Sequence, residues 1–152
     1  MLSKKAKYGL KAMLRLAREY GRGPLLIADL AAEESIPKKF LEFILLELKQ
    51  QGMLESKKGK GGGYFLAQRP EEISVGRVLR ALDGSLTLVG CVGDPQAKTC
   101  TECGDSGTCR IRALMDEVNE ATTTILDGAT LDQVMGRADA EPRRPLLQRY
   151  HI

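Results

Sequence analysis

The sequence lacks several features that many proteins of its size possess. Its 152 residues include no tryptophan and one histidine, His151, and aromatic residues make up 5% of the chain. A core must therefore be built mainly from Leu, Ile, Val, Met and Ala. Because His151 lies in a terminal stretch not expected to fold, no histidine is at hand to activate a catalytic cysteine, which argues against that class of enzyme.

Long apolar runs are also missing. No stretch approaches the ~20 apolar residues that a membrane-spanning helix needs, and the lysine- and arginine-rich first 21 residues contain no apolar segment typical of a signal peptide. We therefore expect a cytoplasmic protein, in which thiols are normally reduced. Only four cysteines are present, all within residues 91–109, and such clustering favours metal or redox chemistry over structural disulfides.

Charge is distributed unevenly along the chain. Residues 1–69 hold 14 Lys and Arg against 7 Asp and Glu, a balance of +7, whereas residues 70–152 hold 9 against 13, a balance of −4; together they give the net +3. A basic first half indicates a polyanionic partner for that half. A solvated basic face without a partner is the alternative.

The first half shows helix-turn-helix spacing. Apolar periodicity predicts an amphipathic helix over 3–20, and residues 27–34 have high helix propensity. Pro37 suits the first turn of a further helix running to about residue 51. The core-facing residues of this third helix are expected to be Leu41, Ile44, Leu45 and Leu48.

Two short strand-like runs then flank the glycine- and lysine-rich segment KKGKGGG at 57–63, which predicts a β-hairpin wing. Glycines allow the backbone to approach another surface closely, and lysines suit phosphates. A nucleotide-phosphate loop is the competing interpretation, but the spacing of a P-loop and its following helix are absent. The expected fold is mainly α with a small β wing.

The second half predicts a helix capped by Ser74 and, after the cysteines, a long helix to about residue 127. Its apolar seam has heptad-like spacing and is expected to pair with a second copy of the chain, or else to fold back on its own domain. The seam consists of Ile111, Leu114, Val118, Ala121 and Ile125. Thr130 and Gln133 form a capping-box pattern that starts a last short helix.

We accordingly divide the chain into a DNA-binding domain at 1–83, a cysteine-rich loop at 84–109, a dimerisation segment with the short helix at 110–136, and a disordered tail at 137–152.

Several phrases together resemble a known family: SKKAKYGLKAML at 3–14, IPKKFLE at 36–42, KGKGGGYFLA at 58–67 and ISVGRVL at 73–79. They resemble the small redox- and iron–sulfur-responsive winged-helix repressors that include IscR, NsrR and CymR. The resemblance implies a homodimer that binds near-palindromic promoter DNA, with the third helix in the major groove and the wing in the minor groove.

On that basis, candidate DNA contacts lie on the third helix and the wing: Lys38, Lys39, Phe40, Glu42, Phe43, Lys57, Lys58, Lys60, Gly61, Gly62 and Tyr64. A glutamate can accept from a cytosine amino group, and an exposed phenylalanine can contact a thymine methyl. Phe43 could instead be a core residue. Because Pro37, Lys39 and Phe43 stand where IscR-like members carry polar side chains, the operator is expected to differ from theirs.

The resemblance also implies that three cysteines hold a cluster, here Cys91, Cys103 and Cys109. Cys100 is additional, and Arg112 stands where an IscR-like histidine ligand would be. Cys100 is therefore the expected fourth ligand of an all-thiolate iron–sulfur site, either 2Fe-2S or 4Fe-4S. A carboxylate of a partner subunit is the alternative fourth ligand.

Other uses of the four thiols remain open: a zinc site, a thiol–disulfide switch without metal, or an inert loop in a CymR-like regulator controlled by a separate effector. A small iron–sulfur carrier is a more distant alternative, since a carrier needs no basic wing.

Overall fold

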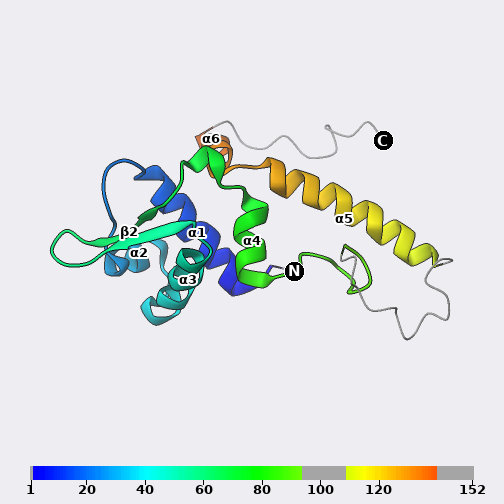
Figure 1. Cartoon of the computed structure of the whole chain (residues 1–152), viewed down its shortest axis with the longest axis horizontal. Helices are drawn as coiled ribbons and strands as arrows, with labels where there is room; N and C mark the ends of the chain where they lie inside the picture. The colour runs from blue at the N-terminus through cyan, green and yellow to red at the C-terminus, as the bar shows by residue number, and fades with distance from the viewer. Residues whose placement is uncertain (1, 94–108, 140–152) are drawn as a thin grey trace.

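The computed structural model describes residues 2–93 and 109–139, and it is mainly helical with one small hairpin (Figure 1). The elements follow in the order α1 (Lys4–Arg18), α2 (Ile27–Glu34), α3 (Lys38–Gln50), β1 (Leu54–Lys57), β2 (Gly63–Leu66), the 3-10 turn η1 (Pro70–Glu72), α4 (Val75–Asp83), α5 (Arg110–Gly128) and α6 (Leu131–Asp139). The predicted fold class is confirmed. Within the described ranges, no helix is long and apolar enough to cross a membrane.

The core of the N-terminal domain is built around α3, which packs against α1, α2 and α4. The four side chains expected to face the core, Leu41, Ile44, Leu45 and Leu48, are all fully buried. The tight connection from α2 to α3 is made possible by Ser35, whose backbone is left-handed at φ 55° and ψ 46°. This arrangement is the helix-turn-helix that the spacing predicted.

The buried face of α1 is broader than the apolar stripe that periodicity predicts, which consists of Tyr8, Leu10, Met13, Leu14 and Ala17. Met13 and Ala17 are buried, and Tyr8, Leu10 and Leu14 pack half-buried against the core. The fully buried face also includes Ala6, Gly9 and Ala12. Alanine and glycine contribute little to an apolar periodicity, yet their small size lets α1 approach its neighbours closely. A Cβ added at Gly9 would overlap Cδ1 of Leu82 on α4, so close packing determined this face.

The wing is an antiparallel pair in which Leu54 lies opposite Leu66 and Lys57 opposite Gly63. Leu25 joins it: its N–H donates to the Tyr64 carbonyl at 2.9 Å, and the Tyr64 N–H donates to the Leu25 carbonyl at 2.8 Å. Gly63 has a φ of 142°, and a Cβ there would overlap the Leu25 carbonyl oxygen. Glycine is thus required where the wing joins the domain.

α5 extends away from the helical body (Figure 1), and none of its residues is buried. Its C-terminal end is held by Asp127, whose two carboxylate oxygens accept from Arg80 of α4 at 2.7 and 2.5 Å. The Val75 N–H also donates to the Ala129 carbonyl at 2.8 Å. A Cβ at Gly76 would overlap Oδ1 of Asp127, so this glycine permits the ion pair.

α6 packs back on the N-terminal domain, with Leu131 fully buried in the same core as α1 and α3. Thr130 and Gln133 form the expected capping box, through Thr130 N–H to Gln133 Oε1 at 3.4 Å and Gln133 N–H to Thr130 Oγ1 at 3.3 Å. The helix continues to Asp139, past residue 137 where the tail was expected to begin. The remainder of that tail, 140–152, lies outside the described residues.

Replacing Gly9 with alanine should destabilise the protein. The added methyl meets the buried Leu82 side chain, and overpacking outweighs the gain in helix propensity, leaving a net loss of about 1–2 kcal/mol in the free energy of unfolding. Gly136→Ala is the matched control, because this exposed helical glycine has open space around its Cβ position. Urea denaturation at fixed protein concentration measures both; equal midpoints for wild type and Gly9→Ala would contradict the packing argument.

Asp127→Asn should lower stability at neutral pH by about 0.5 kcal/mol, because both partners of this ion pair are some 40% exposed. The Arg80 guanidinium holds the pKa of Asp127 below its usual value. The pair's contribution is therefore complete above the ordinary aspartate pKa of about 3.9 and declines as pH falls through the lowered folded value. Denaturation midpoints measured from pH 7 downward should differ between variant and wild type at first, and the difference should begin to shrink below about pH 4. The control is Asp116→Asn, which removes the loose 3.8 Å pair with Arg112 and should give the wild-type midpoint at every pH.

Candidate nucleic-acid interface

Burial of the inner face of α3 determines which side chains of that helix point outward. Lys38, Lys39, Glu42 and Phe43 are all exposed, and Phe43 is exposed by 72%. The possibility that Phe43 is a core residue is therefore excluded in this chain. These side chains provide cationic, acceptor and apolar groups along one helix face.

Phe40 differs from the other candidates on α3. It is half-buried, and its ring meets the Tyr8 ring edge-on with 5.8 Å between centroids. At the other end of the helix, Lys5 pairs with Glu47 at 2.8 Å. These two contacts hold α3 against α1 and so orient its outward face.

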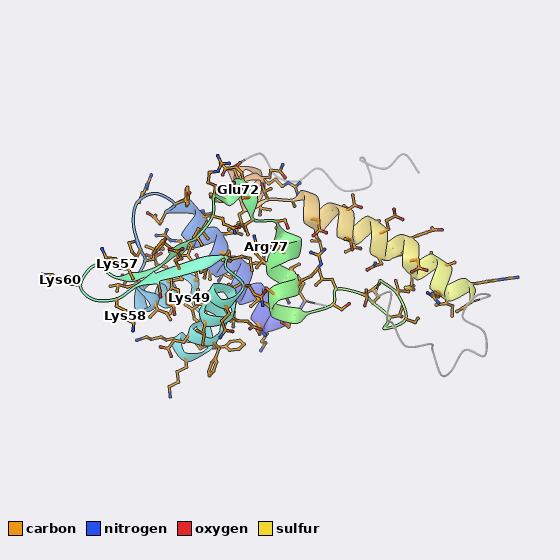
Figure 2. All side chains as sticks on the ribbon, viewed as in Figure 1. Lys49, Lys57, Lys58, Lys60, Glu72 and Arg77 are labelled. Atoms are coloured by element: carbon orange, nitrogen blue, oxygen red, sulfur yellow. The ribbon has the colours of Figure 1, made fainter. Side chains whose placement is uncertain are left out.

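The wing places its candidate residues at a free end that projects beyond the helices (Figure 2). Lys57, Lys58, Lys60 and Gly61 are exposed. Gly62 is buried instead, because its Cα lies against the Lys57 carbonyl, which a Cβ would overlap.

Tyr64 is half-buried in β2 and shares two backbone hydrogen bonds with Leu25. Its backbone therefore anchors the base of the wing, away from the lysines at the free end.

The lysines of this surface have no acidic partner. Among the described residues, Lys38, Lys39, Lys57, Lys58 and Lys60 form no ion pair, and the same holds for some other cations of the domain, such as Lys4, Lys7 and Arg18. Seven other basic side chains do pair with carboxylates: Lys5, Lys11, Arg15, Arg22, Arg69, Arg80 and Arg112. Unpaired ammonium groups remain available to phosphates without first breaking an internal pair.

Sequence reasoning missed three exposed residues on α3. Leu46 and Gln50 continue the outward stripe three and seven residues after Phe43, and Lys49 donates to Ser56 Oγ of β1 at 2.6 Å, linking helix and wing (Figure 2). Helical periodicity would have found Leu46 and Gln50 had the stripe been extended from Phe43.

The cysteine region is described only at its two ends. Cys91 and Cys109 are half-buried, and Cys109 directly precedes α5 as its N-cap residue. Cys100 and Cys103 lie outside the described residues. Among 2–93 and 109–139, no group of three or more potential metal ligands is present, so the four-cysteine site stays a prediction.

The chain approaches α5 just after Cys91, at Gly93. A Cβ at Gly93 would come within 2.9 Å of Nδ2 of Asn119 and would also crowd Thr87. Arg112, at the position of the absent histidine, contacts Asp116 at 3.8 Å. Cys109, the N-cap residue of α5, and Gly93 are thus the described points at which the cysteine region adjoins this helix.

The apolar seam of α5 remains uncovered by the described parts of its own chain. Ile111 is 68% exposed and Leu114 and Ile125 are each 55% exposed; Ala121 is also exposed and Val118 is half-buried. Folding of the seam back onto its own domain is therefore not observed.

Comparison with known proteins agrees with this geometry. Residues 2–137 match the Rrf2 family model, described as an iron-dependent transcriptional regulator. The chain is 35% identical over 151 residues to an rrf2-like HTH-type transcriptional regulator of Rhodobacter capsulatus, covering 97% of this chain and 99% of that protein.

Two solved structures show the same fold. CymR, the global cysteine regulator of B. subtilis, superposes with a TM-score of 0.75 at 27% identity, covering 90% of this chain and 97% of that one. IscR of T. potens gives a TM-score of 0.73 at 26% identity, covering 97% and 96%. The relatives are named as regulators, not enzymes or carriers, and this chain belongs to the Rrf2 family of helix-turn-helix transcriptional regulators.

Proposed function

We propose that this protein is a homodimeric, cytoplasmic transcriptional repressor whose operator binding is controlled by the state of the cysteines between residues 91 and 109. The observation that carries the DNA-binding part is the set of unpaired lysines on α3 and the wing, which flank an outward helix face on an Rrf2 domain. The regulatory part is supported by the chemistry of four clustered thiols.

In this proposal α3 enters the major groove and the wing follows the backbone into the adjacent minor groove. Lys38, Lys39 and the three wing lysines contact phosphates and position the protein, while Glu42 and Phe43 reach base edges. Phe40 supports α3 from behind, consistent with its packing on Tyr8.

Dimerisation is supported by α5. Its seam of five apolar residues is spaced in the 3-4 pattern of paired helices and lacks a cover among the described residues of its own chain. Two copies joined along α5 would present two α3 helices to the successive half-sites of a near-palindrome.

Cys91, Cys103 and Cys109, with Cys100 as fourth ligand, are the residues that would hold an iron–sulfur cluster. An all-thiolate donor set suits such a cluster, and the two described members, Cys91 and Cys109, are partly shielded from solvent. When bound, the cluster would make the protein responsive to iron supply and oxidants. Zinc binding, a thiol–disulfide switch without metal, and a CymR-like regulator controlled by a separate effector are the alternatives, and the similarity to CymR supports the last of them.

A physical route from the cysteines to DNA follows from the contacts of α5. Gly93, two residues after Cys91, lies near Asn119 of α5, and the C-terminal end of α5 is bound to α4 by the Arg80–Asp127 pair. A change of order in the cysteine loop would thus alter how α5 is held, and with it the spacing of two DNA-reading domains in a dimer.

The double variant Lys58→Ala/Lys60→Ala should bind DNA more weakly by a similar factor on every sequence. Loss of two phosphate contacts should reduce the slope of log affinity against log salt by about 2. Gel-shift or anisotropy titrations over a range of salt measure this slope. Arg137→Ala on α6, an exposed cation away from the wing (Figure 1), is the control and should leave it unchanged; an unaltered slope in the wing variant would refute the phosphate role.

Protein purified without oxygen should contain iron and acid-labile sulfide and absorb broadly in the visible region. Cys91→Ala and Cys109→Ala should each abolish this absorption and shift operator affinity, since each removes a thiolate ligand. Metal analysis and absorption spectra provide the readout. Colourless protein that contains one zinc per chain would contradict the cluster and indicate a zinc site. Operator affinity that is unchanged in every cysteine variant would exclude control through the cysteines.

A further inference from the structure

An apolar pair stands exposed in the middle of the outward face of α3. Phe43 is 72% exposed and Leu46 is 48% exposed. Isolated exposed apolar residues are common, but these two are three residues apart on one helix, so their side chains are neighbours. Neither is covered by another described part of the chain.

The surroundings of the pair indicate what covers it. Lys39 lies four residues before Phe43, Gln50 lies four residues after Leu46, and both are exposed on the same stripe. Lys38 lies on the same helix, and the wing is joined to α3 by the hydrogen bond from Lys49 to Ser56; neither Lys38 nor the wing lysines pair with a described carboxylate. A hydrophobic protein partner would have to desolvate these unpaired charges, whereas a nucleic-acid groove would neutralise them with its phosphates.

The major groove offers one apolar group that suits such a pair, the 5-methyl group of thymine. Residues three apart on a helix are separated by about 4.5 Å along its axis, close to the ~3.4 Å spacing of successive bases along a strand. Phe43 and Leu46 can therefore meet methyl groups on neighbouring base pairs without leaving the groove.

We infer that Phe43 and Leu46 form a thymine-methyl reader, so that the operator half-site contains adjacent thymines where the middle of α3 enters the groove. This inference rests on the proposed reading of DNA by α3. Glu42, a hydrogen-bond acceptor beside the pair, contributes a separate preference for a cytosine amino group. By burying thymine methyl groups, Phe43 and Leu46 would distinguish thymine from bases that lack a methyl group.

The test begins with the full-length protein and a pool of random duplexes, from which binding sequences are enriched at physiological ionic strength. The enriched sequences are then copied once with thymidine and once with deoxyuridine, which pairs identically but lacks the methyl group. Each buried methyl should account for about a four-fold difference in affinity, so two methyls should give roughly a sixteen-fold preference for thymidine in each half-site.

The protein variants assign this preference to the two side chains. Phe43→Ala and Leu46→Ala should weaken binding to thymidine DNA and reduce the ratio of thymidine to deoxyuridine affinities, each by about four-fold. Leu88→Ala, an exposed leucine after α4, is the matched control and should keep the wild-type ratio. Far-ultraviolet circular dichroism and thermal melting verify that each variant is folded, as expected for side chains exposed to this extent.

The outcomes separate this inference from the proposed function. Enriched, salt-dependent binding that is equal for thymidine and deoxyuridine copies would overturn the methyl reader while leaving the DNA-binding function intact. A wild-type preference that persists in both alanine variants would overturn the assignment to Phe43 and Leu46. If no sequence is enriched and binding is independent of salt, the proposed DNA-binding function itself fails.

Discussion

Burial of one face of α3 is the constraint on which the rest of the molecule depends. Leu41, Ile44, Leu45 and Leu48 are fully removed from solvent between α1, α2 and α4, which at about 25 cal/mol per Å² is a large share of the domain's hydrophobic stabilisation. Because a helix turns through a fixed angle per residue, this burial leaves no freedom in the direction of Phe43 and Leu46. Domain stability and the proposed reading of DNA therefore depend on opposite faces of the same helix.

Two further joints connect the wing and α5 to the domain that contains this helix. At the wing, the contact between Gly63 and Leu25 ties the hairpin to the start of α2 and leaves its lysines free at the other end. At α5, the Arg80–Asp127 pair over Gly76 connects the helix to α4. Both joints require glycine because another group occupies the space of a side chain. The charged groups at the α5 joint are paired, whereas the lysines of α3 and the wing that we propose to contact DNA form no ion pair with the described residues.

Much of this could be predicted from local sequence. The helix-turn-helix, the wing and the long helix were all expected, since apolar periodicity, Pro37 and the glycine-rich turn act over a few residues. The buried face of α1 was predicted too narrowly, because Ala6, Gly9 and Ala12 pack closely while contributing little to an apolar pattern. Leu46 was missed as part of the outward face, although its position follows from that of Phe43. The sequence thus predicted which face of α3 and which hairpin form the candidate site. It did not predict that Phe40, at the edge of that face, packs half-buried against Tyr8.

The sequence by itself determined the order and type of elements, the basic character of the first half and the clustering of four thiols, because these depend on residue identity and short-range spacing. Only the tertiary structure decided that α6 returns to the core of the first domain. It also decided, within residues 2–93 and 109–139, which lysines lack acidic partners and that no other part of the chain covers the seam of α5. These are contacts between residues far apart in the chain. Their geometry is set by how whole faces pack, which no local pattern records.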